Sequence, residues 1–238
     1  MFKLKSDYDL VFILFFIFLS IAASNISLSK VWGAPGQTFT MFEFLAPLPA
    51  AFLGPLKGIV VLIIAKGFST IFSSATFDFV TLIRFIPPIL GAYFFATFKQ
   101  NNKNNLFVFF VILSCILLFI IHPVGQKAWI FSLYWLIPIL VILLPSSNVF
   151  FRALGATFSQ HAIGSVIWLY FVSPANPEFW LALIPIVAIE RLVFASGIAF
   201  SYLTSLKILA ILNNFVFLRL FKKQPLFYPY IEREKNKK

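Results

Sequence analysis

Acidic residues, histidines and cysteines are scarce in this chain of 238 residues, which contains eight Asp and Glu, two His and one Cys. The single cysteine, Cys115, allows neither a disulfide framework nor a cysteine metal site, and two histidines are too few for a histidine cluster. A metal site needs several donors, and only Glu43, His161 and Glu190 are plausible contributors. The sequence therefore predicts no metal ligation.

Signatures of catalysis and nucleotide binding are also absent. The chain has no Gly-rich phosphate loop, no His-Glu-x-x-His zinc motif, no Gly-x-Ser-x-Gly nucleophile elbow and no pair of intramembrane aspartates. We predict no catalytic residue, no cofactor and no ATPase within the chain. Acid-base chemistry between His161 and Glu190 is chemically possible, so an intramembrane enzyme stays open as a lesser alternative.

Apolar residues dominate what is present. Hydrophobic residues make up 61% of the chain and charged residues 11%, whereas roughly a quarter of an ordinary soluble domain is charged. A membrane span needs about 20 mostly apolar residues, and only helices or closed barrels satisfy the backbone in lipid. The sequence predicts an all-α, polytopic membrane helix bundle of about seven transmembrane helices, with six or eight left open. The seven apolar runs cover residues 10–28, 44–65, 79–98, 106–121, 128–144, 149–172 and 179–203.

Basic residues give the chain a net charge of +11, and many of them follow the last apolar run. Positive residues near span ends favour the cytoplasmic side and contact anionic lipid headgroups. No aromatic-basic motif accompanies them, so we predict a partnership with the lipid bilayer and none with nucleic acid. We expect residues 1–205 to form the bundle, and residues 206–238 to form an interfacial amphipathic helix followed by a basic, cytoplasmic tail.

Two of the runs have recognisable irregularities. The second, 44–65, contains Pro47, Pro49, Gly54 and Pro55, which predicts a broken helix packed against protein. The fourth and fifth runs are separated by a short polar segment at 122–127 and are expected to form a helical hairpin.

Ionisable residues inside the runs carry most of the chemical information, because a charge in lipid is costly and normally faces the bundle interior or a watery cavity. We expect Arg152 to snorkel from its span end, and Arg84 either to snorkel or to contact a ligand. Glu190 and Arg191 lie too deep to snorkel and predict an internal polar cluster. His161 is expected either to hydrogen-bond a neighbouring helix or to contact a ligand.

The segment between the first two runs adds another candidate. Trp32, Gln37 and Glu43 combine an indole with hydrogen-bonding side chains beside the broken second run. Such a loop suits the cover of a small-molecule pocket, although a simple turn is the alternative. We assign the other tryptophans, at 129, 135, 168 and 180, to the interfacial aromatic belt. The predicted substrate-binding residues are Trp32, Gln37, Glu43, Arg84, His161, Glu190 and Arg191.

Residues 42–67, with the Gly54-Pro55-x-x-Gly58 pattern, resemble the second-helix region of the S components of energy-coupling factor vitamin transporters, and Arg84 with the Pro87-Pro88 pair continues the similarity. The resemblance implies a substrate-binding subunit in the cell membrane that captures a vitamin or other micronutrient. Its partners would be a membrane coupling subunit and two ATPases. The seven runs depart from the six helices of that family. A membrane scaffold of the rod-shape-determination type is the alternative.

Overall fold

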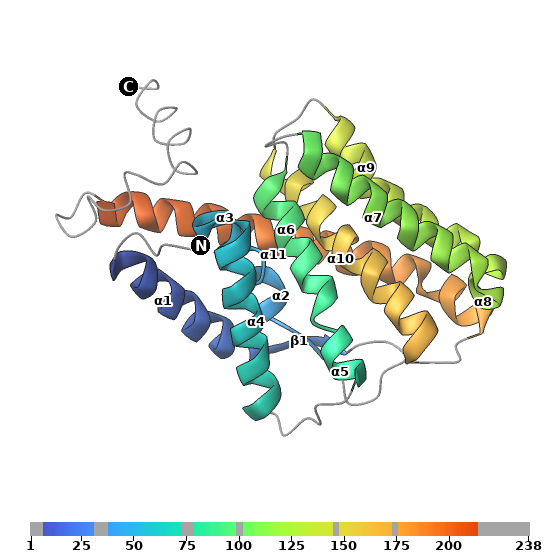
Figure 1. Cartoon of the computed structure of the whole chain (residues 1–238), viewed down its shortest axis with the longest axis horizontal. Coiled ribbons are helices and arrows are strands. Elements are labelled where there is room, and N and C mark those ends of the chain that lie inside the picture. Colours follow the sequence, from blue (N-terminus) through green and yellow to red (C-terminus); the bar gives the residue numbers. More distant parts are fainter. Residues whose placement is uncertain are drawn as a thin grey trace.

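The computed structural model describes residues 7–30, 38–72, 79–98, 102–144, 148–172 and 176–213, which form a helical bundle with one short strand pair (Figure 1). Helices dominate the described residues, as predicted. The elements in chain order are α1 (Asp7–Ser24), β1 (Ser27–Lys30), β2 (Thr38–Thr40), α2 (Phe42–Leu45), α3 (Leu48–Leu53), α4 (Pro55–Phe72), α5 (Phe79–Ile83), α6 (Ile86–Thr97), α7 (Asn102–Ile121), α8 (Pro123–Lys127), the 3-10 helix η1 (Trp129–Trp135), α9 (Leu136–Leu143), α10 (Val149–Phe171) and α11 (Pro177–Asn213).

Three helical segments of the described chain are long and apolar enough to cross a membrane. They are Phe79–Thr97, Asn102–Ile121 and Pro177–Ile208, and they correspond to the third, fourth and seventh predicted runs. The other runs fold as helices that are shorter or less apolar. The three long helices agree with a membrane protein, and the count of seven spans stays a prediction.

The first apolar run differs from the prediction at its end. Helix α1 stops at Ser24, and residues 27–30 pair with 38–40 as an antiparallel β1–β2 ladder that an all-α class does not include. Ser24 Oγ and Asn25 Nδ2 donate to the carbonyls of Ser20 and Ile21, at 2.9 Å each, and so satisfy acceptors that a continued helix would use. The backbone N–H groups of Asn25 and Ile26 then donate to the carbonyls of Ala22 and Ala23, which closes the end of the helix with tighter turns.

The second run is broken, as its prolines and glycines predict. Gly54 has φ of +88°, a backbone conformation that glycine adopts without steric cost, and Pro55 is the first residue of α4. Helices α3 and α4 then pack so closely that a Cβ on Gly58 would overlap the backbone of Pro49 and Ala50. The Gly54-Pro55-x-x-Gly58 pattern is therefore the sequence of a tight helix–helix turn.

The predicted hairpin of the fourth and fifth runs is present, with an irregular second arm. His122 Nδ1 accepts a hydrogen bond from the backbone N–H of Val124 at 3.2 Å and caps the short helix α8. The chain then returns along α7 as η1 and α9 (Figure 1). Ser132 and Trp135, three residues apart, lie on the same side of the 3-10 helix η1, and both are buried, as is Phe131.

Helix α11 is longer than the seventh run and extends along the molecule (Figure 1). It continues without a break from Pro177 to Asn213, so the predicted boundary between residues 205 and 206 falls within one helix. The interfacial position of the stretch after 205 stays a prediction, and the basic tail at 214–238 lies outside the described residues.

Helix α10 is the centre of the bundle, in contact with α6, α7, α9, η1 and α11. Small residues allow this close packing: a Cβ on Gly155 would collide with the ring of Phe94 on α6. Near the N-terminal end of α10, the guanidinium of Arg152 lies 4.2 Å from the ring centre of Phe95 and donates to that residue's carbonyl. Arg152 packs against the aromatic rings of Phe95 and Tyr202, and its snorkelling to a membrane interface stays a prediction.

Candidate functional site

A cavity of about 270 Å³ lies among β2, α2, α4, α6, η1, α10 and α11. Its wall combines charged side chains, amide and hydroxyl groups, and aromatic rings, which is the composition of a ligand pocket rather than of a packing defect. The charged, hydrogen-bonding and aromatic residues of the wall include Glu43, Lys66, Arg84, Phe131, Gln160, His161, Ser165, Trp168, Phe179, Trp180, Glu190 and Arg191.

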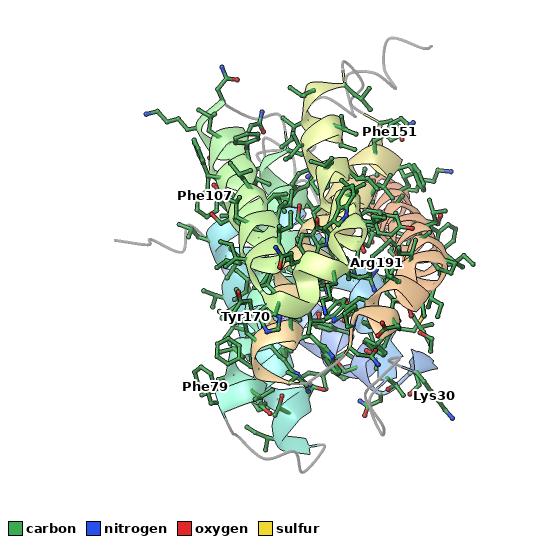
Figure 2. The ribbon with its side chains drawn as sticks, turned by 90° about the vertical axis from the view of Figure 1, so that its right-hand side faces the viewer. Lys30, Phe79, Phe107, Phe151, Tyr170 and Arg191 are labelled. Atoms are coloured by element: carbon green, nitrogen blue, oxygen red, sulfur yellow. The ribbon has the colours of Figure 1, made fainter. Side chains whose placement is uncertain are left out.

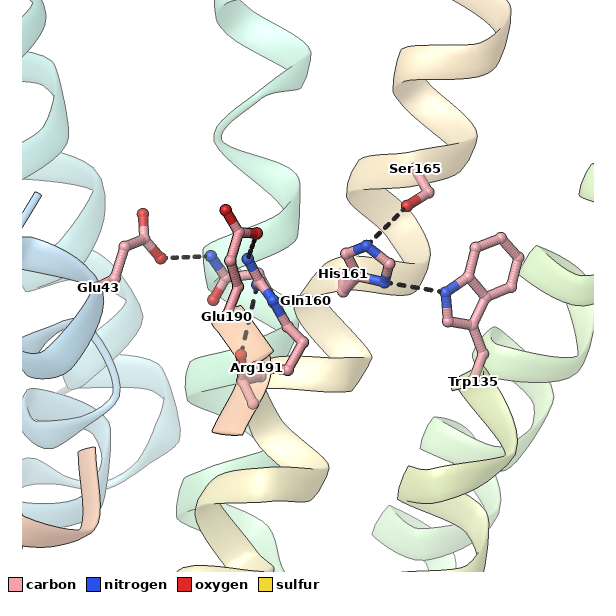
Figure 3. A network of polar contacts seen from close by, with 8 residues as sticks. Glu43, Trp135, Gln160, His161, Ser165, Glu190 and Arg191 are labelled. Carbon is pink, nitrogen blue, oxygen red and sulfur yellow. Dashed lines mark hydrogen bonds and ion pairs between the residues drawn. The ribbon is translucent and has the colours of Figure 1, made fainter. Parts of the chain in front are cut away.

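Five of the seven predicted site residues line this cavity: Glu43, Arg84, His161, Glu190 and Arg191. They come from α2, the turn between α5 and α6, α10 and α11, so helix packing brings together residues that are far apart in the sequence. Figure 3 shows Glu43, His161, Glu190 and Arg191 together. The remaining two, Trp32 and Gln37, lie outside the described residues.

Glu43 and Gln160 connect α2 to α10. Gln160 Nε2 donates to Glu43 Oε2 at 2.6 Å, a short hydrogen bond to a charged acceptor (Figure 3). On α6, a Cβ at Gly91 would lie 3.1 Å from Gln160 Oε1, so glycine leaves the amide the room that it needs. Gln160 stands next to His161 in the sequence, but nothing in its neighbourhood reveals Glu43 as its partner.

Glu190 and Arg191 form the predicted internal polar cluster. Arg191 is 3% exposed, its Nη2 lies 3.4 Å from Glu190 Oε2, and its Nη1 donates to Thr157 Oγ1 at 3.4 Å. The guanidinium also lies 4.5 Å from the ring centre of Phe194. Figure 2 shows Arg191 at mid-height of the molecule, between Phe79 near one end and Phe151 near the other. Arg191 is therefore buried in the bundle, whereas Glu190 beside it is 18% exposed.

His161 is hydrogen-bonded to another element, as one of its two predicted roles requires. The indole Nε1 of Trp135 on η1 donates to His161 Nδ1 at 3.1 Å, and Ser165 Oγ lies 3.4 Å from His161 Nε2 (Figure 3). A nitrogen that accepts from an indole carries no proton, so the proton of the neutral ring lies on Nε2 and faces Ser165. In this tautomer His161 cannot take the proton of the Ser165 hydroxyl, so the two do not form an activated nucleophile.

Lys66 is the charged residue of the cavity that the sequence reading misses. Lys66 lies one position beyond the apolar run 44–65, so hydropathy places it at a membrane boundary. Helix α4 continues to Phe72, however, and Lys66 lines the cavity. Lys66 Nζ donates to the backbone carbonyl of Arg84 at 2.9 Å. The guanidinium of Arg84 lies 5.6 Å from the ring centre of Trp168. Lys66 and Arg84 thus both contribute cationic side chains to the wall.

Aromatic rings form another part of the wall. Phe131 and Trp180 meet edge to face with centroids 5.0 Å apart, and Phe179 lies 6.0 Å from Trp180. Trp135 and Trp180 are 0% and 2% exposed, so their assignment to the interfacial belt is wrong. Within the described chain, the indole nitrogens of Trp168 and Trp180 and Nε of Arg191 are buried without a hydrogen-bond partner. The wall thus contains more N–H donors than its own acceptors satisfy.

Among the described residues, no group of three His, Cys, Asp or Glu side chains is placed to hold a metal ion. No family model, curated protein or solved structure matches the chain.

Proposed function

We propose that this chain is a multi-pass protein of the cell membrane that binds a small molecule in the central cavity. It would act as the substrate-binding subunit of an uptake system and work with a separate coupling subunit and ATPases. The observation that carries the proposal is the convergence of six ionisable side chains, including Lys66 and His161, on one cavity of an apolar bundle.

The outer surface supports the membrane location. Large apolar side chains are exposed along several helices, among them Phe18 on α1, Leu143 on α9 and Phe200 on α11. Extended apolar surface of this kind is unusual on a soluble monomer and suits a bilayer. Charges inside such a bundle are expensive, and residues that face a cavity commonly belong to a substrate or ion pathway.

Binding without catalysis is the role that the site chemistry favours. In the neutral His161 ring the proton lies on Nε2, toward Ser165, so the ring does not activate that hydroxyl. The two carboxylates of the wall already have partners: Glu43 accepts from Gln160, and Glu190 pairs with Arg191. A scaffold of the rod-shape-determination type would need no polar cavity at all. The uptake role rests further on the resemblance around Gly54-Pro55-x-x-Gly58, whose residues form the turn that leads into Lys66-bearing α4.

The test is to purify the full chain from its native membrane in mild detergent and identify co-purified molecules by mass spectrometry. We expect a small organic molecule, a membrane coupling protein and ATPases. Lys66→Gln should lose the small molecule, whereas Lys127→Gln, at an exposed position on α8, should retain it. A preparation without any bound molecule, in which uptake by the cells is unaffected by Lys66→Gln, would refute the binding role.

Reconstitution tests the dependence on partners. The chain alone in proteoliposomes should bind its ligand without concentrating it, because the sequence has no nucleotide site to supply energy. Uptake by the isolated chain at the rate of the complete system would overturn the subunit role.

A further inference from the structure

The hydroxyl of Ser165 is placed differently from other hydroxyls of the helices. Several of these donate to the carbonyl four residues earlier, namely Ser24, Thr70, Thr97, Ser114 and Ser159. Ser165 on α10 instead directs its Oγ toward the His161 ring, 3.4 Å from Nε2 (Figure 3). The residue is 6% exposed and lines the cavity. Its hydroxyl therefore belongs to the buried wall of the site.

Trp135 determines the direction of the hydrogen bonds that lead to Ser165. An indole N–H only donates, so the 3.1 Å contact from Trp135 Nε1 makes His161 Nδ1 an acceptor. The proton of the neutral imidazole then lies on Nε2 and is donated to Ser165 Oγ. Ser165 is thus the acceptor in its contact with His161, and its own O–H proton has to be donated to another group.

The described chain provides no second partner for this hydroxyl. The two carboxylates of the cavity wall have partners of their own, because Glu43 accepts from Gln160 and Glu190 pairs with Arg191. A buried donor without an acceptor is unfavourable, and an acceptor on a bound molecule removes this cost. The Ser165 O–H is therefore a donor that is available to a molecule in the cavity.

The neighbours of Ser165 add no acceptor. Trp168, one turn further along α10, also lines the cavity, and its indole Nε1 is buried without a partner in the described chain. Pro87 and Pro88 of α6 line the cavity with rings that carry no polar side-chain atom. A Cβ at Gly164, next to Ser165, would lie 3.8 Å from the Pro87 ring, so α6 is close to α10 here.

We propose that Ser165 is a specificity-determining residue, whose hydroxyl donates to a carbonyl oxygen or an unprotonated ring nitrogen of the bound molecule. Trp135 and His161 are positioning residues that act through Ser165, because they fix the direction in which its hydroxyl donates. This inference rests on the proposed binding function and specifies one chemical group of the substrate.

Two probes with the same ring skeleton test the proposal: indan-1-one, which carries a carbonyl acceptor, and indane, which carries none. Their binding to the full chain in detergent is measured by ligand-observed NMR, with partition into empty micelles subtracted. Ser165→Ala should lower indanone affinity about fivefold, the factor that corresponds to one neutral hydrogen bond, and leave indane affinity unchanged. Ser165→Thr keeps the hydroxyl and should keep the preference for indanone.

Ser159→Ala is the matched control. Ser159 is a buried serine of the same helix, but its hydroxyl donates to the Gly155 carbonyl at 2.8 Å and does not line the cavity. The variant should change the affinity of neither probe. An equal loss of indanone affinity in Ser159→Ala and Ser165→Ala would show that the effect is structural, and would overturn the role of Ser165.

Spectroscopy tests the hydrogen bond itself. The carbonyl stretching band of bound indanone should lie at lower frequency in the wild type than in Ser165→Ala, because donation to the oxygen weakens the C=O bond. Nitrogen-15 NMR of the wild type should show His161 as a neutral ring protonated on Nε2. In Trp135→Phe the ring is free to change tautomer and accept from Ser165, so indanone affinity should fall although Ser165 is intact.

Several results would overturn the inference: failure of indanone to bind above the micelle background, equal carbonyl frequencies in the wild type and Ser165→Ala, or a His161 ring protonated on Nδ1. The binding function is tested separately by the co-purified molecule and by uptake. Failure of the Ser165 inference is therefore distinguishable from failure of the proposed function.

Discussion

The close contact between α3 and α4 makes Gly58→Ala the sharpest test of the fold. An added Cβ at residue 58 would lie 2.5 Å from the carbonyl carbon of Pro49 and closer still to the backbone of Ala50. Ordinary carbon contacts begin near 3.5 Å, and the Cα of Ala50 would lie only 2.0 Å away, so the two helices would have to separate by about 1.5 Å. No side-chain rotation can relieve this overlap, because the obstructing atoms belong to the backbone.

Overpacking in a core usually lowers the free energy of unfolding by about 1 to 3 kcal/mol. We expect Gly58→Ala to cost at least about 3 kcal/mol, because its collision is with the backbone. For a protein of this size, about 3 kcal/mol corresponds to a fall in the melting temperature of roughly 6 to 12 °C. Thermal unfolding in detergent micelles measures this directly. Binding of the small molecule should weaken as well, because α4 carries Lys66 into the cavity wall.

Gly67→Ala is the matched control on the same helix. A Cβ there would meet no atom within 4 Å, and alanine is a better helix former than glycine by up to about 1 kcal/mol. We expect a melting temperature equal to or slightly above that of the wild type. If Gly58→Ala and Gly67→Ala unfold at the same temperature, then α3 and α4 do not pack as described, and the reasoning from Gly58 fails.

Two further predictions concern the polar contacts of the cavity. Glu190→Gln should lower the free energy of unfolding by about 2 kcal/mol, because breaking a fully buried pair costs about 3 to 5 kcal/mol, an exposed pair contributes about 0 to 1, and Glu190 is 18% exposed beside a buried Arg191. Glu178→Gln, at an exposed position on the same helix, is the control and should have little effect. If Glu190→Gln has the thermal stability of the wild type, the Glu190 carboxylate lies in water. A double-mutant cycle with Gln160→Leu and Glu43→Leu should give a coupling free energy of about 1.5 to 3 kcal/mol by thermal or denaturant unfolding, as for a hydrogen bond to a charged group. Additive effects would show that the bond between α2 and α10 contributes nothing.

The helical class and five of the cavity residues were predictable because both depend on local composition. Long apolar runs favour helices in any apolar environment. A charge in such a run, as at Arg84 or at the adjacent Glu190 and Arg191, is conspicuous because its burial requires a partner or a cavity. The prolines and glycines of 44–65 predicted the break for the same reason, since their effect on the backbone is local.

Tertiary structure alone decided which of these residues meet. Glu43 and Gln160 are 117 positions apart, and no local pattern pairs them. Lys66 lines the cavity because helix α4 continues past residue 65, where the apolar run ends. Trp135 and Trp180 are buried because neighbouring helices cover them. Hydropathy shows only how apolar a residue is. Whether its side chain faces the cavity, a neighbouring helix or the outer surface depends on how the helices pack, and close approaches such as the one at Gly58 set that packing.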